Sequence, residues 1–344
     1  MTDAWQELQM ARPLRTAIVG FGAIADTLGD DQKMRRYFGA ASHAEVLKSL
    51  SMFDVGAVLD PREEPRRRAS LHWGVPNVFS TNTDFLEGYD PEVLVMTSPP
   101  GQRFELLKRC DNLKGVFLEK PLGDEASEIF RWSNERGIPV QVNYWRRAVA
   151  EFLFGQPKFV LREAGDIQAV FGIYGNGLRN NGSHLIDLAR MLLGEVVSAH
   201  SLASPDFKRM PKLAGDSDIG FSLTFSTGIQ MAVLPVNFDH YREVAIDIWG
   251  SKARVSVTQE SLVVQSSPRM PNRGLENEHE IASDNYHSIQ PSVRNSLSKL
   301  YENLFGAMSN GEPLLSGIAS ASATERVVDA VIKSAISDAK EISV

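Results

Sequence analysis

The segment 180–187, NNGSHLID, contains a histidine with the surroundings of a proton-transfer group. His184 lies four residues after Asn180 and three before Asp187. An apolar helical pattern follows, and Ser183 is a good N-cap candidate, so we expect His184 to open a helix. A histidine beside the positive end of a helix dipole tends to stay neutral, which suits a general base. The alternative is a purely local role at the helix start; for Asp187 we favour a structural role.

A lysine in the tripeptide EKP, residues 119–121, is the second candidate for chemistry. The tripeptide follows a buried apolar strand, and open α/β sheets bind their ligands at the carboxyl ends of strands. At such a position Lys120 can donate a hydrogen bond to a cofactor ribose or to a substrate hydroxyl. The alternative is an ordinary surface lysine after a strand.

The segment 20–25, GFGAIA, has the spacing of a dinucleotide-binding turn, G-x-G-x-x-A. Gly20 permits the tight turn, Gly22 lets the backbone approach a pyrophosphate, and Ala25 lets a helix pack closely on the strand. The amino end of that helix would bind the phosphates. A strand–helix turn with no ligand is the alternative, but the preceding strand favours a dinucleotide. The remaining residues of the predicted cofactor loop are Phe21, Ala23 and Ile24.

The acidic residue that ends the next strand is Asp60, in AVLDPREE. A carboxylate there accepts hydrogen bonds from the adenosine ribose hydroxyls and repels a 2′-phosphate. Arg62 and the run 66–68 follow, and one of these arginines can instead bind such a phosphate, although a solvated helix face is the simpler reading of the run. We therefore expect NAD as the cofactor, with NADP as the alternative.

Periodicity predicts the elements that position these residues. From residue 14 to 145, short apolar strands alternate with helical patterns, which indicates a parallel sheet covered on both faces. After residue 145 the pattern is mostly strands, with a hairpin around 226–228 and one main helix, 183–193. We expect an α/β fold with a Rossmann domain, 14–145, followed by an α+β domain, 146–344, whose sheet is large, open and mostly antiparallel.

Two segments near the end of the chain complete this prediction. An amphipathic helix over about 317–339 closes the chain, and it can pack back on the first domain. The stretch 266–290 is polar and irregular, and we interpret it as a long loop.

Composition narrows the function classes. The chain has 344 residues, a formal charge of −7 and one cysteine, which argues against nucleic acid or an anionic membrane as partner and allows neither an internal disulfide nor a cysteine-based zinc site. No run approaches the roughly 20 apolar residues that span a bilayer, and the first residues lack the apolar core of a signal peptide. We expect a cytoplasmic protein. Four histidines show no metal-ligand spacing: His43, His72, His200 and His287.

These motifs together resemble the glucose–fructose oxidoreductase, inositol dehydrogenase and rhizopine-catabolism family (Gfo/Idh/MocA). The resemblance covers nearly the whole chain and rests on GFGAIA, TSPP, EKPLG, NYWRR, GSHLIDLARMLLGE and IDIWGSKARVSV. It implies a Rossmann domain followed by a sheet whose open face often makes subunit contacts, and hence a homodimer or homotetramer. It also implies NAD(P)-dependent oxidation or reduction at a hydroxyl or keto carbon of a sugar, nucleotide sugar or cyclitol.

The resemblance also implies roles for individual residues. Lys120 would contact the nicotinamide ribose and the reacting hydroxyl, His184 would take or give the proton, and Arg146 would lie on the substrate side. The family often has an aspartate where this chain has Asn180, whose neutral amide orients a partner but does not shuttle a proton. The TSPP and EKP segments add three residues to the cofactor set: Ser98, Pro99 and Glu119.

Two further departures accompany Asn180. Arg103 stands where many members have a histidine, and about fifteen extra residues within 26–42 separate the glycine turn from His43. The insertion is expected to border the adenosine end of the cofactor site. The turn YGNGLRNN, rich in hydrogen-bonding groups, supplies the candidate substrate-binding residues, with an ordinary glycine-rich hairpin loop as the alternative: Tyr174, Asn176, Arg179 and Asn181.

Three other functions remain open. Asn180 and Arg103 motivate a non-catalytic protein that senses a cofactor or a sugar on the same fold. A relative that cleaves glycosides or epimerises sugars would oxidise its substrate transiently, with no net change of the cofactor. A methyltransferase would use the glycine turn for S-adenosylmethionine, but this leaves EKP and GSHLID unexplained.

Overall fold

The computed structural model describes most of the chain, and the described residues form two compact units. The first unit combines the residues up to Ala148 with Arg294–Ser322, and the second combines Val149–Val293 with Ala323–Val344. The first unit is therefore built from two separate stretches of sequence. The described residues are 12–32, 34–153, 159–202, 213, 215–282, 284–291 and 293–344.

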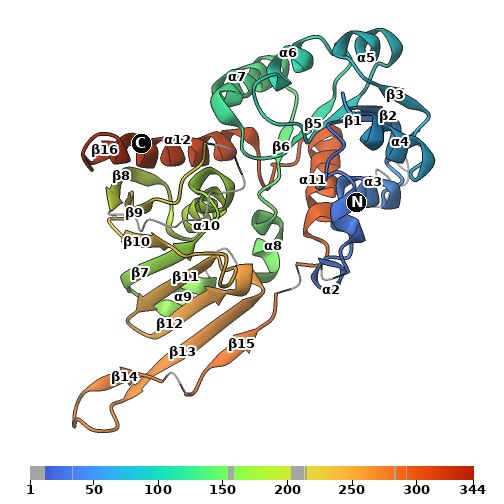
Figure 1. Ribbon diagram of the computed structural model, residues 1–344. Coiled ribbons are helices and arrows are strands. Elements are labelled where there is room, and N and C mark those ends of the chain that lie inside the picture. Colours follow the sequence, from blue (N-terminus) through green and yellow to red (C-terminus); the bar gives the residue numbers. More distant parts are fainter. Residues whose placement is uncertain are drawn as a thin grey trace. The chain divides into compact units, whose positions relative to one another are not determined.

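A parallel sheet of six strands forms the centre of the first unit, in the order β3-β2-β1-β4-β5-β6 (Figure 1). The central strands β4 and β5 are buried along their whole length, as expected for strands covered on both faces. This order is that of a doubly wound sheet, and the predicted Rossmann fold is confirmed. The strands are β1 (Leu14–Val19), β2 (Phe53–Leu59), β3 (Asn77–Phe79), β4 (Val93–Met96), β5 (Gly115–Leu118) and β6 (Val140–Val142).

Helices cover both faces of this sheet, each over its own apolar cluster. One cluster contains Val46 of α3 and Leu300 of α11, and the other contains Phe85 of α5 and Ile129 of α7. The covering α-helices are α3 (His43–Ser49), α4 (Glu63–Leu71), α5 (Asn82–Gly88), α6 (Arg103–Lys108), α7 (Ala126–Arg136) and α11 (Ser296–Asn310).

The helix expected directly after the glycine turn is interrupted by the insertion. The N–H group of Asp26 donates to the carbonyl of Gly22, after which the chain forms η1 (Thr27–Asp30) and α2 (Met34–Tyr37). Helical bonding resumes when the N–H of His43 donates to the carbonyl of Ile24, at 3.1 Å. The insertion thus leaves and re-enters one helical path, which sequence periodicity could not show because its two halves are far apart in the sequence.

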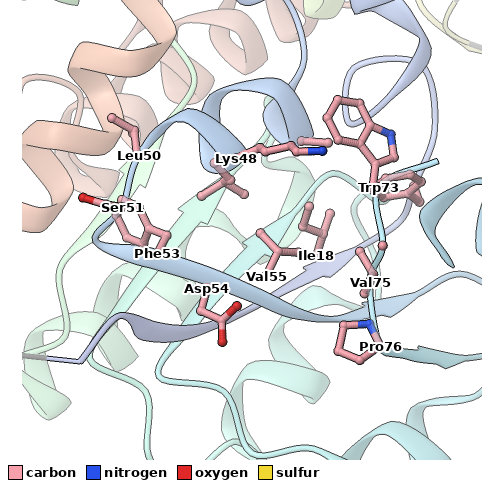
Figure 2. A pocket seen from close by; sticks show the side chains of 14 residues that line it. Ile18, Lys48, Leu50, Ser51, Phe53, Asp54, Val55, Trp73, Val75 and Pro76 are labelled. Atoms are coloured by element: carbon pink, nitrogen blue, oxygen red, sulfur yellow. The ribbon is translucent and has the colours of Figure 1, made fainter. Parts of the chain in front are cut away.

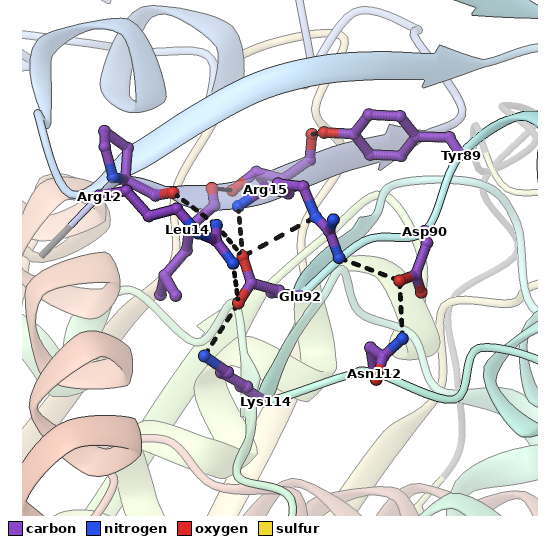
Figure 3. A network of polar contacts seen from close by, with 10 residues as sticks. Arg12, Leu14, Arg15, Tyr89, Asp90, Glu92, Asn112 and Lys114 are labelled. Carbon is purple, nitrogen blue, oxygen red and sulfur yellow. Dashed lines mark hydrogen bonds and ion pairs between the residues drawn. The ribbon is translucent and has the colours of Figure 1, made fainter.

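A buried carboxylate joins the amino ends of three strands (Figure 3). The Glu92 side chain is 4% exposed, and its oxygens lie 2.6 Å from Nη1 of Arg12 and 2.8 Å from Nζ of Lys114. It also accepts the backbone N–H of Arg15, in β1. Burial alone would raise the pKa of Glu92, but these hydrogen bonds outweigh it and lower the pKa to about 2. Glu92 is therefore ionised and holds β1, β4 and β5 in register.

A cavity of about 310 Å³ opens beside α3 on the same unit (Figure 2). Its floor is apolar, and its polar groups include Lys48 and Asp54. The Lys48 ammonium lies 5.6 Å from the centroid of the Trp73 ring. Because the amino half of β2 lines this cavity, it lies away from the carboxyl ends of the strands, where sheets of this type bind ligands.

The second unit is built on a sheet of ten strands, in the order β14-β13-β12-β11-β7-β10-β9-β8-β16 with β15 beside β13 (Figure 1). All its pairs are antiparallel except β7 with β10, which agrees with the predicted mostly antiparallel sheet. The strands are β7 (Ile167–Tyr174), β8 (Val196–Leu202), β9 (Gly220–Phe225), β10 (Gln230–Pro235), β11 (Ala245–Gly250), β12 (Ala253–Thr258), β13 (Val263–Pro271), β14 (His279–Ile281), β15 (His287–Ile289) and β16 (Ile342–Ser343).

The predicted long loop over 266–290 is wrong in part, because β13 continues to Pro271 and both β14 and β15 pair with it. The side chains of this arm are largely polar and exposed, so no buried face marks it as strand in the sequence. Its pairing comes from backbone hydrogen bonds, such as that from Asn272 N–H to the Glu278 carbonyl at 2.9 Å.

Helix α10 (Ser183–Leu193) contacts β7 and β11, and most of its apolar side chains are buried. Three large apolar side chains of the same sheet are instead exposed by about half: Phe171, Val197 and Leu234. The remaining helices are α8 (Arg146–Leu153), α9 (Phe159–Ala164) and α12 (Ile318–Ala335). Among the described residues, no helix has both the length and the apolar character needed to cross a membrane.

Candidate cofactor and catalytic site

The glycine turn packs closely against the loop after β4. Gly20 has φ +81°, and a Cβ atom built on it would lie 2.7 Å from the backbone nitrogen of Ser98. A side chain at residue 20 would therefore be strained and would clash with backbone. A Cβ on Gly22 would meet only Nη2 of Arg62, at 3.7 Å. The backbone at Gly20 therefore packs directly against the loop after β4. At Gly22 the turn has space for a ligand to come close to the backbone.

Asp60 is buried beneath this turn, with a side chain 1% exposed. One carboxylate oxygen accepts from Phe21 N–H at 2.7 Å and from Arg62 Nη2 at 2.8 Å. The other accepts from the N–H and Nε of Arg62, at 2.9 and 3.0 Å. Burial favours a higher pKa for Asp60, but the bonds from Arg62 and Phe21 prevail and lower it. Asp60 is therefore an ionised anchor for the glycine turn in this structure, and it does not present free oxygens to a ribose as expected.

Glu119, at the end of β5, belongs to a buried chain of hydrogen bonds. Its Oε1 lies 2.9 Å from Nε2 of His43 and 2.5 Å from Nδ2 of Asn143. On the other side of the imidazole, the hydroxyl of Tyr301 lies 2.6 Å from Nδ1. An ionised carboxylate only accepts, so His43 donates from Nε2 and Tyr301 donates to Nδ1. Burial would raise the pKa of Glu119, but the bonds from His43 and Asn143 lower it.

Arg103 ties the two loops that flank this edge. Its side chain is buried. Nη1 donates to the carbonyl of Glu119 at 2.6 Å and to the carbonyl of Pro121 at 3.1 Å. Nε donates to the carbonyl of Ser98 at 2.9 Å. The guanidinium thereby fixes the backbone on both sides of Lys120, whose own side chain is half-buried. The sequence shows Arg103 only as a departure from the family pattern, because nothing near it in the sequence indicates the carbonyls of Glu119 and Pro121 as its partners.

The first unit therefore gathers the predicted cofactor residues at one edge of its sheet. The strands β2, β1, β4 and β5 are parallel neighbours, so the residues that follow them share their carboxyl ends. The backbone of the glycine turn and the partly buried Lys120 lie there, which fits a dinucleotide whose phosphates approach Gly22. The residues gathered at this edge or in its loops are Gly20, Phe21, Gly22, Ala23, Ile24, Asp60, Arg62, Ser98, Pro99, Glu119 and Lys120.

In the second unit, His184 does not open its helix, and that expectation is wrong. A π-helical turn, η3 (Leu178–Gly182), runs directly into α10. Ser183 has helical φ and ψ and donates from its hydroxyl to the carbonyl of Arg179 at 2.8 Å, so it is no N-cap. His184 follows this turn and is half-buried. It therefore does not lie at the positive end of a helix dipole, where it was expected to stay neutral.

Two carboxylates outside the segment NNGSHLID accept hydrogen bonds from the backbone of the turn before His184. Asp216 is buried and accepts the backbone N–H groups of Arg179 at 3.0 Å and Asn180 at 2.9 Å. Asp218 accepts the N–H of Gly177 at 2.8 Å. These acceptors satisfy the first donors of the helical segment, the task that the sequence assigned to Ser183. The Asn180 amide donates to the carbonyl of Asn176 at 3.2 Å, one helical turn before it.

Two of the expected substrate-binding side chains, Tyr174 and Asn181, hydrogen-bond to backbone groups of the protein. The Tyr174 hydroxyl is buried and exchanges hydrogen bonds with the carbonyl and N–H of Ile219, at 2.7 and 2.8 Å, and burial raises its pKa. Asn181 donates to the carbonyl of Gly175 at 3.0 Å, and Arg179 pairs with Asp329 at 2.8 Å. An irregular turn must satisfy its own buried polar groups, and Tyr174 and Asn181 do so, whereas Arg179 forms an exposed pair with a residue outside the turn.

Three further predicted residues have defined surroundings. Asn176 is buried and adopts φ 63°, a conformation that asparagine tolerates. Arg146 is buried, with its guanidinium 4.5 Å from the centroid of the Trp145 ring. Asp187 is buried and accepts from the hydroxyl of Thr324 at 3.1 Å, an arrangement consistent with the structural role favoured for it. In the part of the chain that the structure describes, no group of three or more acidic, histidine or cysteine residues could hold a metal ion.

The first unit has the fold and the glycine turn of an NAD-binding oxidoreductase domain, and a comparison with protein-family models agrees. Residues 14–144 match an oxidoreductase family with an NAD-binding Rossmann fold, and residues 175–343 match the C-terminal alpha/beta domain of that family. The chain belongs to the Gfo/Idh/MocA oxidoreductase family, as its motifs predicted. No curated protein matches the chain.

Solved structures with the same fold include two sugar-binding dehydrogenases. The WlbA dehydrogenase from Chromobacterium violaceum, in complex with NADH and UDP-GlcNAcA, is 19% identical at a TM-score of 0.72, covering 97% of each chain. Levoglucosan dehydrogenase, in complex with NADH and L-sorbose, is 17% identical at a TM-score of 0.72, covering 97% of this chain and 99% of the other. A super-repressor mutant of Gal80p from Saccharomyces cerevisiae is 14% identical at a TM-score of 0.70, covering 96% and 97%.

Proposed function

We propose that this oxidoreductase is an NAD(P)-dependent dehydrogenase or reductase that acts on a hydroxyl or keto carbon of a sugar, nucleotide sugar or cyclitol. The observation that carries the proposal is the carboxyl edge of the first unit, where the Gly20–Ser98 contact shapes the glycine turn and Arg103 fixes the backbone around Lys120. The fold likeness to two dehydrogenases crystallised with NADH and a sugar ligand supports the substrate class.

The roles of the residues follow from their chemistry. When bound, the nicotinamide supplies or accepts the hydride. Lys120 donates a hydrogen bond to the oxygen of the reacting carbon, and in the oxidising direction His184 accepts the hydroxyl proton. Asn180 is neutral and its amide already donates to the turn, so it holds the turn and orients its neighbours but moves no proton.

Two separate experiments measure the cofactor that the purified protein retains and the turnover of candidate substrates. Native mass spectrometry of the purified protein detects retained nicotinamide, and a panel of polyols and nucleotide sugars is then followed at 340 nm, the band of the reduced nicotinamide. We expect Lys120→Ala and His184→Ala each to lower turnover by about 10²-fold or more. Arg67→Ala, which removes an exposed pair with Glu64, is the matched control. Turnover like that of wild type in both variants would remove the proposed roles.

A double variant tests whether the two groups act in one step. If Lys120 and His184 serve the same proton-transfer step, the combined substitution costs much less than the product of the single losses. Losses that multiply would instead assign the two residues to independent steps.

A second candidate is a non-catalytic protein that binds a cofactor and a sugar. The neutral Asn180 at the position where family dehydrogenases often have an aspartate favours it, and so does the fold likeness to Gal80p, crystallised as a super-repressor mutant. This candidate predicts tight cofactor binding with no reduction of the bound cofactor by any member of the panel.

We also propose that a second copy of the chain covers the exposed face of the ten-stranded sheet, giving a homodimer or homotetramer. Phe171 and Leu234 lie on neighbouring strands of that face and are each 51% exposed. Light scattering tests this: Phe171→Glu with Leu234→Glu should convert an oligomer to monomers, whereas Leu275→Glu, at an exposed residue between β13 and β14, should not.

A further inference from the structure

The carboxylate expected to select NAD is covered by protein. Asp60 is 1% exposed, and a carboxylate has about four acceptor positions, two on each oxygen. All four are filled, by Phe21 N–H and by three donors of Arg62: its backbone N–H, Nε and Nη2. A ribose hydroxyl therefore has no vacant oxygen on Asp60 to donate to.

The group that faces solvent at this point is the guanidinium of Arg62. Its side chain is 62% exposed, and Nη2 lies 3.7 Å from the position of a Cβ on Gly22. The guanidinium thus extends from Asp60 towards the glycine turn, the direction in which an adenosine ribose and its pyrophosphate lie in this fold. Within the described part of the chain, Nη1 of Arg62 donates no hydrogen bond, so one donor nitrogen is unused.

A second arginine holds the same loop. Nη1 of Arg66 donates to the carbonyls of Asp60 and Pro61, both at 2.8 Å, which places its positive charge beside the end of β2. The other arginines of the run are paired elsewhere: Arg67 with Glu64, and Arg68 with Asp26 and Asp30. With Asp60 paired to Arg62, the guanidinium of Arg66 adds a second positive charge beside the loop. Glu63 and Glu64, exposed in the first turn of α4, are the nearest acidic residues in sequence.

We propose that Arg62, assisted by Arg66, binds the 2′-phosphate of an adenosine ribose, so that the protein takes NADP(H) at least as well as NAD(H). This inference rests on the proposed function, because it presumes a dinucleotide in the glycine turn. Arg62 is the residue that sets the cofactor preference, and Asp60 acts through it by holding the guanidinium in place. A phosphate dianion gains charge-assisted hydrogen bonds from arginine that a ribose hydroxyl does not.

Two small probes isolate the 2′-phosphate. The compounds 2′,5′-ADP and 5′-AMP differ only in that group, and isothermal titration calorimetry measures the affinity of each without turnover. We expect wild type to bind 2′,5′-ADP more tightly by about tenfold or more, the factor that one hydrogen bond to a charged group supplies. Arg62→Ala should remove most of this preference and change 5′-AMP affinity little. Arg67→Ala, on the same helix, is the control and should retain the preference.

NADPH and NADH, titrated by quenching of tryptophan fluorescence, repeat the test with complete cofactors. Wild-type binding of NADH tenfold tighter than NADPH, or an equal loss of both in Arg62→Ala, overturns this inference and leaves the cofactor proposal standing. Failure of wild type to bind any of the four compounds overturns the proposed function itself. Selective loss of NADPH and 2′,5′-ADP in Arg62→Ala supports both.

Discussion

Nε2 of His43 lies 2.9 Å from Oε1 of Glu119, a residue 76 positions further along the chain. The pair links the helix that resumes after the insertion to the residue directly before Lys120. Because Tyr301 hydrogen-bonds the other ring nitrogen, three segments of the first unit meet at one buried imidazole.

Removing this imidazole should destabilise the first unit. His43→Ala takes one donor from a buried carboxylate and opens a cavity, so we expect the free energy of unfolding to fall by about 3 kcal/mol. Tyr301→Phe removes only the hydroxyl and should cost about 1 kcal/mol. Urea unfolding followed by circular dichroism measures both values. A His43→Ala protein as stable as wild type would show that the hydrogen-bonded chain contributes nothing.

Replacing Arg103 should impair catalysis more than folding. Arg103→Lys keeps the charge but cannot bridge the carbonyls of Ser98 and Glu119, since a lysine lacks the planar fork of donors. Small displacements of a reacting group cost up to about 10²-fold, and we expect kcat/KM to fall by about that amount. Steady-state kinetics measures the effect on catalysis, and a thermal melt measures the effect on folding. The exposed Arg109→Lys is the control. Unchanged kinetics would contradict the positioning role.

The two glycines of the turn should respond differently to alanine. Gly20→Ala places a Cβ 2.7 Å from the Ser98 backbone at a positive φ, and should destabilise the protein by about 3 kcal/mol. Gly22→Ala has room within the protein, so its stability should stay near wild type while cofactor affinity falls, because the Cβ lies where the pyrophosphate approaches. Thermal melts and cofactor titration test the pair. Normal cofactor binding by Gly22→Ala would argue against this turn as the phosphate site.

Glu92 should make the stability of the first unit depend on acidity. Its pKa is about 2 when folded, below the ordinary value of 4.5, so it stabilises the fold fully above about pH 5 and loses that contribution as the pH falls towards 2. Glu92→Gln should lower stability at pH 7, and the difference from wild type should shrink through this window. Urea unfolding across pH measures this difference, with Glu87→Gln, at an exposed residue outside this network, as the control. A difference that stays constant with pH would exclude this titration.

Local patterns were sufficient to predict the fold class and the family. GFGAIA, EKP and GSHLID are short segments whose chemistry depends on neighbours in sequence, and the alternation of strand and helix reports burial on the faces of a parallel sheet. The same reasoning predicted that Lys120 and the glycine turn lie at the carboxyl edge of the sheet, because the end of a buried parallel strand has a known place in such a sheet.

Tertiary structure decided which partners these residues have. Nothing near His43 in sequence indicates Tyr301 or Glu119, and nothing near Asn180 indicates that Asp216 accepts its N–H. Tyr174 carries a polar tip typical of a binding site, yet folding turns that tip inward to Ile219. A hydrogen bond needs two groups within about 3 Å, and for groups distant along the chain only the folded backbone sets that separation. The sequence by itself therefore determined the kind of protein, while the fold determined which side chains are left to meet a ligand.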